Sequence, residues 1–400
     1  MANSSDDDGQ LDNGHRSDDE VQATQTRAKR RIAALEFELE TLKASSKKPR
    51  QNDTMAHRGR AIRRLITLYD NVEDLIAEYD RRQELAAEDP DQGVFDSSLD
   101  PQIIRDQDRL YSSFEELVEF LPWFKKKILH CDADELDDIC KQLRKGADGA
   151  RGDDTAGLKQ EIVIWLTDLF HPVEPPLRTT TKDERGFVHD VTGKLICPAE
   201  YNWILQSVKD KVRDRDPSHL VTAHSWPLFI YQNFKFDATD AEQGLFRSSL
   251  LVKAFKFLFT SPSSARDIDE DGQEAARRQR SSNHKSATKN HVAMILGLKS
   301  VTPRAIAYTA VQVRFALSSV GSWRNVDGDF DYVQFYNAII DFFEVVPGNA
   351  AKQRVDELIS WWNRKVFGKN RRILLPAAVI ANSSVARLAA QRSEREIPSP

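Results

Sequence analysis

The segment 146–203 constrains the fold most, because it concentrates glycine, aspartate, proline and aromatic residues between regular apolar stretches. Glycines and aspartates dominate 146–157, and the residues that follow place apolar side chains on almost every face of a helix. A helix that is apolar nearly all round has to be buried. We therefore expect a loop at 146–157 and a central buried helix that begins near Thr155, with Asp153 or Asp154 as its N-terminal cap.

Further along this segment, two short apolar runs flank a Thr-Gly pair, a pattern that allows one small β-hairpin near 187–197. Four charged residues of the segment are candidates for a common role: Arg151, Asp153, Asp154 and Arg185. The structural interpretation is that they tie loops of the scaffold together. The alternative is that they converge in an open cleft, where the two aspartates would hold a divalent metal for catalysis.

Apolar residues recur at helical spacing on both sides of 146–203, so we predict an all-α protein, an irregular multi-helix bundle. The first of these helices is predicted at 57–87. We expect the arginines of its first turns to be solvated, and the alternative is that they pair with a partner, because cations there oppose the helix dipole. We divide the helical domain into two parts, 54–260 and 291–370. The polar segment 261–290 between them is expected to be disordered, since it has too few apolar residues to bury.

One charged residue lies among the apolar positions of the later helices. Arg314 is the lone interior charge of the apolar stripe 306–317. A buried arginine needs a carboxylate partner. We expect that partner to be Asp329, Asp331 or an acid of 146–157.

The first 53 residues differ in character from the rest of the chain. Residues 1–20 are polar and acidic, and we expect them to be disordered. Apolar residues at alternating four- and three-residue steps within 28–42 predict a short coiled-coil-like helix, through which two copies could associate weakly. A basic cluster before heptads also resembles a basic zipper, although the heptads here are fewer than a stable zipper needs.

Basic residues gather in three clusters, which are the candidate contacts for nucleic acid or for nuclear import. They are Arg27, Lys29, Arg30 and Arg31; Lys47, Lys48 and Arg50; and Arg364, Lys365, Lys369, Arg371 and Arg372. The first two clusters, with the spacer between them, fit a bipartite nuclear import signal. The third ends the last strong helix, where cations also match the negative end of the helix dipole. The residues from 371 to 400 are expected to form a polar tail.

The overall composition limits these interpretations. A formal net charge of −5 excludes a chain that binds polyanions over its whole surface, so any nucleic-acid contact must be local. Three cysteines without a paired framework, behind a polar start that lacks a signal peptide, are expected to be reduced thiols inside a cell. The apolar runs are far shorter than the ~20 residues of a membrane helix, so we expect no membrane association. We expect no cofactor and no metal.

A series of short motifs occurs along the central part of the chain. They are Gly146-Ala147, Ala150-Arg151, Asp153-Asp154-Thr155, Leu158-Lys159, Trp165, Arg185-Gly186, Leu195, Cys197-Pro198, Tyr201-Asn202-Trp203, 304–308, 314–318 and 330–336. Together they resemble a domain of unknown function found in uncharacterised proteins of mushroom-forming (basidiomycete) fungi, over residues 56–345. The resemblance implies a fungal origin but no activity, so it assigns no catalytic residue.

Three functions are compatible with these patterns. The first, which we prefer, is an intracellular helical interaction protein, located in the nucleus and without enzymatic activity, whose protein partners are unknown. The second is a nucleic-acid-binding protein, for example a transposon-associated one, that uses the basic clusters. The third is a metal-dependent enzyme that uses Asp153 and Asp154. We prefer the first because no nucleophile, base and orienting group are found at a spacing that indicates catalysis.

Overall fold

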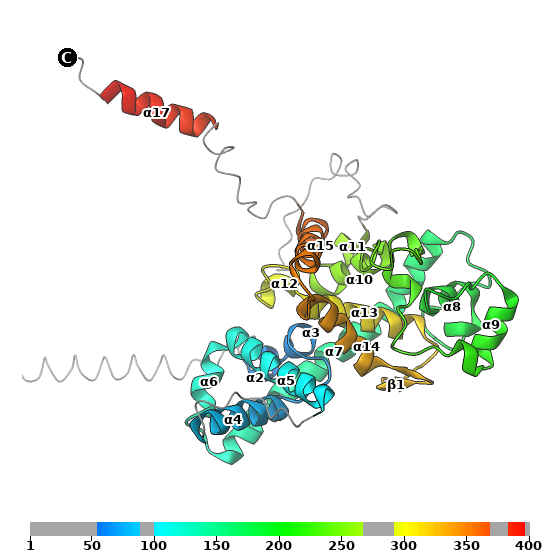
Figure 1. Ribbon diagram of the computed structural model, residues 1–400, viewed down its shortest axis with the longest axis horizontal. Coiled ribbons are helices and arrows are strands. Elements are labelled where there is room, and N and C mark those ends of the chain that lie inside the picture. The colour runs from blue at the N-terminus through cyan, green and yellow to red at the C-terminus, as the bar shows by residue number, and fades with distance from the viewer. Residues whose placement is uncertain (1–53, 89–99, 267–291, 369–382, 397–400) are drawn as a thin grey trace, which may run out of the picture. The chain divides into compact units, whose positions relative to one another are not determined.

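The computed structural model (Figure 1) describes residues 54–88, 100–266, 292–368 and 383–396. The chain divides into two compact units, Met1–Thr54 and Met55–Pro400. The predicted coiled-coil-like helix and the basic clusters at 27–31 and 47–50 lie outside the described residues, as do Lys369, Arg371 and Arg372. The second unit contains nearly all of the described residues.

The described part of this unit is almost entirely helical, which confirms the predicted all-α class. Its elements are α2 Met55–Gly59, α3 Ile62–Leu65, α4 Val72–Glu88, α5 Pro101–Phe120, α6 Pro122–Ile128, α7 Ala133–Leu169, η2 Gly186–Val188, α8 Asp190–Ile196, α9 Gln206–Arg213, η3 Pro217–His219, η4 Leu228–Ile230, η5 Gln232–Phe234, α10 Ser249–Phe259, α11 Pro262–Arg266, α12 Val292–Ile295, α13 Pro303–Leu317, β1 Val326–Asp327, β2 Phe330–Asp331, α14 Tyr332–Glu344, α15 Asn349–Phe367 and α17 Ser384–Glu396. The predicted segment 261–290 is described only through α11, and the predicted tail only through α17.

Short polar side chains set where the longer helices begin. Asp100, Asp132, Thr302 and Asp331 each accept a hydrogen bond from a backbone N–H in the first turn of α5, α7, α13 and α14, respectively. These N–H groups have no partner inside the helix, so the caps satisfy donors that would otherwise be left over. A proline follows the cap in α5 and α13, where its missing N–H costs nothing.

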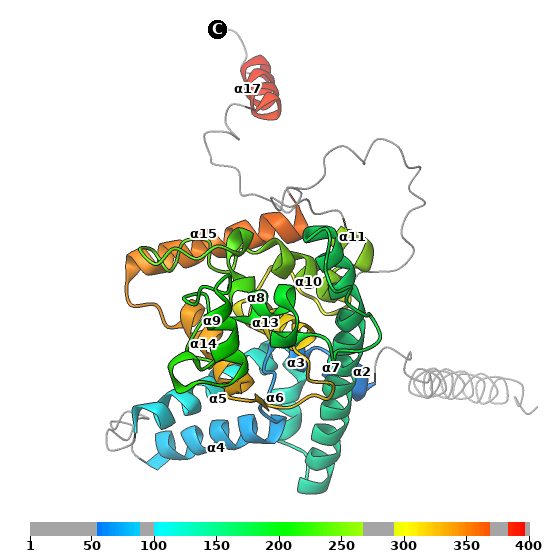
Figure 2. The ribbon, with the colours of Figure 1, turned by 90° about the vertical axis from the view of Figure 1, so that its right-hand side faces the viewer.

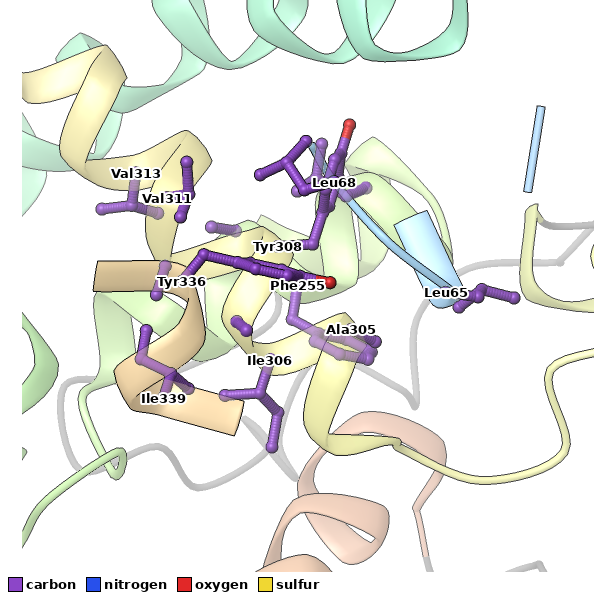
Figure 3. Close-up of a cluster of buried hydrophobic side chains, with 14 of the residues drawn as sticks. Leu65, Leu68, Phe255, Ala305, Ile306, Tyr308, Val311, Val313, Tyr336 and Ile339 are labelled. Atoms are coloured by element: carbon purple, nitrogen blue, oxygen red, sulfur yellow. The ribbon is translucent and has the colours of Figure 1, made fainter. Parts of the chain in front are cut away.

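Helix α13 forms the centre of the core. It contacts α3, α7, α8, α10 and α14, and every residue from Arg304 to Leu317 is buried. In Figure 2, α13 lies in the middle of this unit, between the long α7 on one side and α14. Figure 3 shows part of the core, in which Tyr308 of α13 lies near Phe255 of α10 and Tyr336 of α14. Each buried valine, isoleucine, leucine or phenylalanine side chain of α13 contributes about 1.5–3 kcal/mol by leaving water, so α13 stabilises the packing of the five helices that it contacts.

The loop predicted at 146–157 does not exist, because α7 is one continuous helix from Ala133 to Leu169. The helix is capped at its true start by Asp132, so the prediction that Asp153 or Asp154 caps a helix beginning near Thr155 is also wrong. These aspartates lie in the middle of α7, where Asp154 pairs with Arg64 of α3 and Asp153 pairs with Arg60, which lies between α2 and α3.

Gly146, the first glycine of this segment, allows a close contact between two helices instead of a turn. A Cβ atom added to Gly146 would lie 1.7 Å from the carbonyl oxygen of Ala56 in α2. In the reverse direction, a Cβ on Gly59 would lie 2.1 Å from the carbonyl oxygen of Leu143. The backbones of α2 and α7 therefore touch, and only residues without a side chain fit at this crossing.

The hairpin predicted near 187–197 is also wrong, because this region forms η2 and α8. The ring of His189 accepts a hydrogen bond from the backbone N–H of Val191 and caps α8. Gly193 lies inside α8, where a Cβ would meet the Trp203 ring at 2.4 Å, so this glycine again allows packing. The hairpin of the described chain is elsewhere, where β1 pairs antiparallel with β2.

The single helix predicted at 57–87 is instead three helices, α2, α3 and α4. The expectation that its arginines are solvated fails for Arg63 and Arg64, which are buried in α3. Both are paired with aspartates of α7, and these pairs explain how cations are accommodated inside the bundle.

Candidate functional site

Asp154 belongs to a buried network of paired groups and not to an open site. It is 8% exposed and accepts hydrogen bonds from Nε and Nη2 of Arg64 at 2.7 and 2.6 Å. The hydroxyl of Tyr308 in α13 donates a third hydrogen bond to it, at 2.7 Å. Burial raises the pKa of Tyr308 well above its ordinary value, and the adjacent Asp154 carboxylate adds to the rise, so the hydroxyl keeps its proton and remains a donor. The network ties α3, α7 and α13 together.

The other aspartates of this part of α7 also pair with arginines, which come from 60–63 and from α7 itself. Asp153 is exposed and accepts a hydrogen bond from Arg60 at 2.9 Å. Asp148 lies 3.1 Å from Nε of Arg63 and 3.5 Å from Nη2 of Arg151. Within the described residues, no group of three or more histidine, cysteine or acidic side chains is placed to hold a metal ion. The carboxylates therefore act singly, as partners of guanidinium groups.

Arg185 lies at a different place, at the C-terminal end of α13. It donates hydrogen bonds to the carbonyl oxygens of Ala316, Lys159 and Arg178, at 2.8–2.9 Å. Lys182 donates to the carbonyls of Phe315 and Val320 beside it. Burial lowers the pKa of Arg185 to about 10 and that of Lys182 to about 7. Both side chains satisfy carbonyls at a helix end, where a positive charge also matches the dipole.

The structure thus does not gather the four candidates of this segment in one place. Arg151 pairs with Asp148 and lies over the Trp323 ring, with the guanidinium carbon 5.0 Å from the ring centroid. The sequence signal that could have located the partners is the run of arginines in 60–64. Cations at helical spacing within an apolar stripe indicate an opposite charge on the facing element.

Of the third basic cluster, the described residues are Arg364 and Lys365, in the last turn of α15. Lys365 lies over the ring of Trp361, with Nζ 5.7 Å from the ring centroid. Gly368, with φ of 71°, ends the helix directly after them. This position matches cations to the negative helix end, as the sequence suggests.

Arg314 is the lone charge within 306–317, but α13 begins at Pro303 and contains a second buried arginine, Arg304. Arg304 is 2% exposed and donates hydrogen bonds to the carbonyl of Ile66 and to the hydroxyls of Ser112 and Ser113. Its Nε also lies 3.0 Å from a carboxylate oxygen of Glu116 and 3.4 Å from one of Glu344, although neither contact has the direction of a hydrogen bond. Two carboxylates within this distance compensate the charge of Arg304.

Arg314 is 1% exposed and has no comparable set of partners. The partner predicted from the sequence is wrong, because Asp329 forms a two-point pair with Arg215 and Asp331 caps α14. The nearest carboxylate is that of Asp327, 4.0 Å from Nη1 of Arg314. Among the described residues, none accepts a hydrogen bond from its buried Nε and Nη1. Buried N–H groups of this kind are costly and need an explanation.

Arg314 lines a cavity of about 610 Å³. Its walls come from η2, α8, α9, η3, the end of α13 and the β1–β2 turn. The apolar lining residues are Phe187, Val188, Ile196, Val212, Leu220 and Val221, and the charged or polar ones are Arg213, Arg215, His219, Arg314, Ser318, Ser319, Asp327 and Asp329. A cavity of this size, lined by both apolar and polar side chains, is large enough for a small ligand.

A serine, a histidine and an aspartate meet at the rim of this cavity, in η3, but they are not arranged for catalysis. Ser218 Oγ lies 2.6 Å from Asp216 and 2.9 Å from Nδ1 of His219. In a hydrolase triad the histidine lies between the other two and accepts the serine proton. Here the serine lies in the middle and donates to the aspartate, so the group is a turn that caps η3.

Comparison with known proteins gives one match. The model of DUF6698, a family of unknown function, matches residues 145–367. The matched span contains all residues that line the cavity beside Arg314. No curated protein and no solved structure matches the chain. Among the helices of the described ranges, none is both long enough and apolar enough to cross a bilayer.

Proposed function

The chain belongs to DUF6698, a family of unknown function, and we propose that it is a binding protein whose recognition site is the cavity beside Arg314. One observation carries the proposal. A guanidinium that is 1% exposed lines a cavity of about 610 Å³, while its Nε and Nη1 donate to no described residue. A ligand that accepts these hydrogen bonds would remove a cost that the folded chain otherwise carries.

Recognition agrees with the chemistry around the cavity better than catalysis does. The hydroxyl of Ser218 donates its hydrogen bond to Asp216, so it is not oriented toward the histidine that would act as its base. Burial raises the pKa of the Cys197 thiol to about 12, so this cysteine stays protonated and unreactive at neutral pH. Asp153 and Asp154, the basis of the metal-enzyme alternative, are each paired with an arginine. We place the protein inside the cell and, from its basic clusters, in the nucleus.

Methyl-detected NMR of the full chain tests the proposal. A library of small fragments, each at millimolar concentration, should give hits that shift the methyl signals of Ile196, Val212 and Val221, which line the cavity. Replacing Ser319, an exposed lining residue, by tryptophan should fill the space and abolish these shifts. The proposal is wrong if the hits shift methyls elsewhere, or if Ser319→Trp leaves the shifts unchanged.

Nucleic-acid binding is the second candidate, and its support is the arrangement of basic residues. Arg364 and Lys365 end α15, and the chain continues into Lys369, Arg371 and Arg372. Phosphate contacts release counterions, so retention on DNA should fall steeply as salt rises. Retention that persists unchanged after charge removal at the C-terminal cluster and deletion of 1–53 would reject this candidate.

A further inference from the structure

We infer that the ligand of the cavity beside Arg314 is an apolar molecule, or an apolar chain end, that carries a single carboxylate. This inference rests on the proposed function, because it names the chemistry that the same cavity would recognise. Three features of the cavity support it: the donors of Arg314, the charges of the other lining residues and the apolar wall.

The donors of Arg314 require an acceptor. A guanidinium has five N–H groups and no acceptor atom, so only a group with lone pairs can satisfy it. The Arg314 guanidinium lies over the Phe330 ring, with the guanidinium carbon 4.2 Å from the ring centroid, and its Nε and Nη1 donate to no described residue. Carboxylates and phosphates match the planar fork of arginine with two parallel hydrogen bonds.

The remaining charges of the cavity favour one negative charge over two. Its walls contain three arginines and two aspartates, and Asp190 outside the lining pairs with the third arginine, Arg213, so the positive and negative charges balance. Arg215 already forms a two-point pair with Asp329, and Arg213 donates to the carbonyl of Phe187 and to Asp190. Asp327, 4.0 Å from Arg314, would repel a second negative charge. A carboxylate therefore fits this position better than a phosphate dianion.

The rest of the lining fits an apolar body. Ile196 and Val212 are buried in the wall, whereas Val188, 72% exposed, and Leu220, 36% exposed, offer apolar surface to a ligand. Covering these surfaces contributes about 25 cal/mol for each Å² removed from water. A cavity of about 610 Å³ has room for a medium-length organic acid or for the last residues of a peptide with a free C-terminus.

Titration calorimetry on the full chain with matched probes tests the inference. The probes are octanoate, its neutral isostere octanamide and octyl phosphate, together with the tripeptide acetyl-Gly-Val-Leu as the free acid and as the C-terminal amide. Octanoate should bind roughly tenfold or more tightly than octanamide, because a hydrogen-bonded charge pair replaces a neutral contact. The free-acid peptide should likewise exceed its amide. Whichever acid binds more tightly, octanoate or the peptide, identifies the source of the carboxylate.

Two variants assign the preference to one side chain. Arg314→Met keeps the apolar stem and should bring octanoate and octanamide to equal affinity. The matched control is Arg354→Met, which removes an exposed arginine of α15 that pairs with Glu242 and does not line the cavity, and it should retain the preference. If Arg314→Met does not fold, judged by circular dichroism, the octanoate-to-octanamide ratio of the unaltered chain still tests the inference.

The outcomes separate the inference from the proposed function. Equal binding of octanoate and octanamide by the unaltered chain would overturn the carboxylate assignment and leave the cavity as a binding site. Tighter binding of octyl phosphate than of octanoate would overturn the preference for a single negative charge beside Asp327. If no probe binds, and the fragments of the NMR experiment also fail, both the inference and the proposed function are wrong.

Discussion

Replacing Gly146 by alanine should loosen the crossing between α2 and α7, and the size of the effect follows from the backbone. The added Cβ would lie 1.7 Å from the carbonyl oxygen of Ala56, whereas real Cβ atoms essentially never approach other atoms within 3.0 Å. One helix therefore has to move by more than 1 Å relative to the other. Both groups in the clash belong to helix backbones, so a side-chain rotation cannot relieve it.

Gly149 is the matched control, because it lies in the same helix and a Cβ there would meet no atom within 4 Å. In an open helical position, alanine is about 1 kcal/mol more favourable than glycine. This gain applies to both variants, so it cancels in their difference. The difference is then the cost of overpacking, about 1–3 kcal/mol or more. Gly149→Ala should be more stable than the unaltered chain, and Gly146→Ala less stable.

Equilibrium urea unfolding of the full chain, followed by far-ultraviolet circular dichroism, measures both variants. The midpoint should rise for Gly149→Ala and fall for Gly146→Ala, and Gly59→Ala should behave like Gly146→Ala because its Cβ would lie 2.1 Å from the Leu143 carbonyl. Equal increases for Gly146→Ala and Gly149→Ala would refute the close crossing. The glycines would then only reduce the helical propensity of α7.

Three further predictions use the same unfolding assay. Arg304→Met should lower the free energy of unfolding by about 1–3 kcal/mol, because the buried carbonyl of Ile66 and the hydroxyl of Ser113 lose their donor. Arg314→Met should leave the free energy of unfolding unchanged or raise it, because its Nε and Nη1 have no acceptor among the described residues. Equal losses for the two variants would make Arg314 a structural residue. Asp154→Asn should lower the free energy of unfolding by about 3–5 kcal/mol, because a buried arginine loses its counter-charge. Asp153→Asn, at an exposed position, should lower it by less than about 1 kcal/mol. Similar losses for the two variants would contradict the assignment of the effect to burial. Burial raises the pKa of Glu116 from 4.5 to about 7, against the opposing effect of Arg304. Between these two pH values the native state therefore binds more protons than the unfolded state. The free energy of unfolding should then fall as pH rises from about 4.5 to 7. Glu116→Gln should remove that part of the pH dependence, and an unchanged profile would show that Glu116 keeps an ordinary pKa.

The helical class and the buried character of the central segments were predictable from the sequence, because apolar periodicity is a local property. The chain around Trp165 and the stripe that contains Tyr308 form buried helices, as the spacing predicts. The errors at Gly146 and Gly193 have one common cause. A glycine that allows a turn and a glycine that allows a neighbouring backbone or ring to approach look the same in a single sequence. Only the position of the partner segment distinguishes them, and that is a non-local property.

The candidate site was predictable only in part, for a related reason. Arg314 could be recognised as an interior charge, but the sequence did not show which carboxylate would be close enough to pair with it. Nor could it show that Arg304, on the same helix, obtains partners from α5 and α14 as well as the carbonyl of Ile66. Whether a buried N–H group finds a hydrogen-bond acceptor depends on the positions of several helices and loops, which a single sequence does not reveal.

The contrast between these two arginines is the strongest reason to look for function at the end of α13. Arg304 and Arg314 are 2% and 1% exposed, so both carry the cost of removing a charge from water. At Arg304 the chain supplies hydroxyls, a carbonyl and two glutamates, which shows that this fold can surround a buried guanidinium with acceptors and negative charge. At Arg314 it supplies an aromatic face and a carboxylate 4.0 Å away, beside an open cavity. The buried donors of Arg314 destabilise the chain without a ligand, and Arg314 lines a cavity. A ligand that accepts hydrogen bonds from these donors is the best explanation for this arginine.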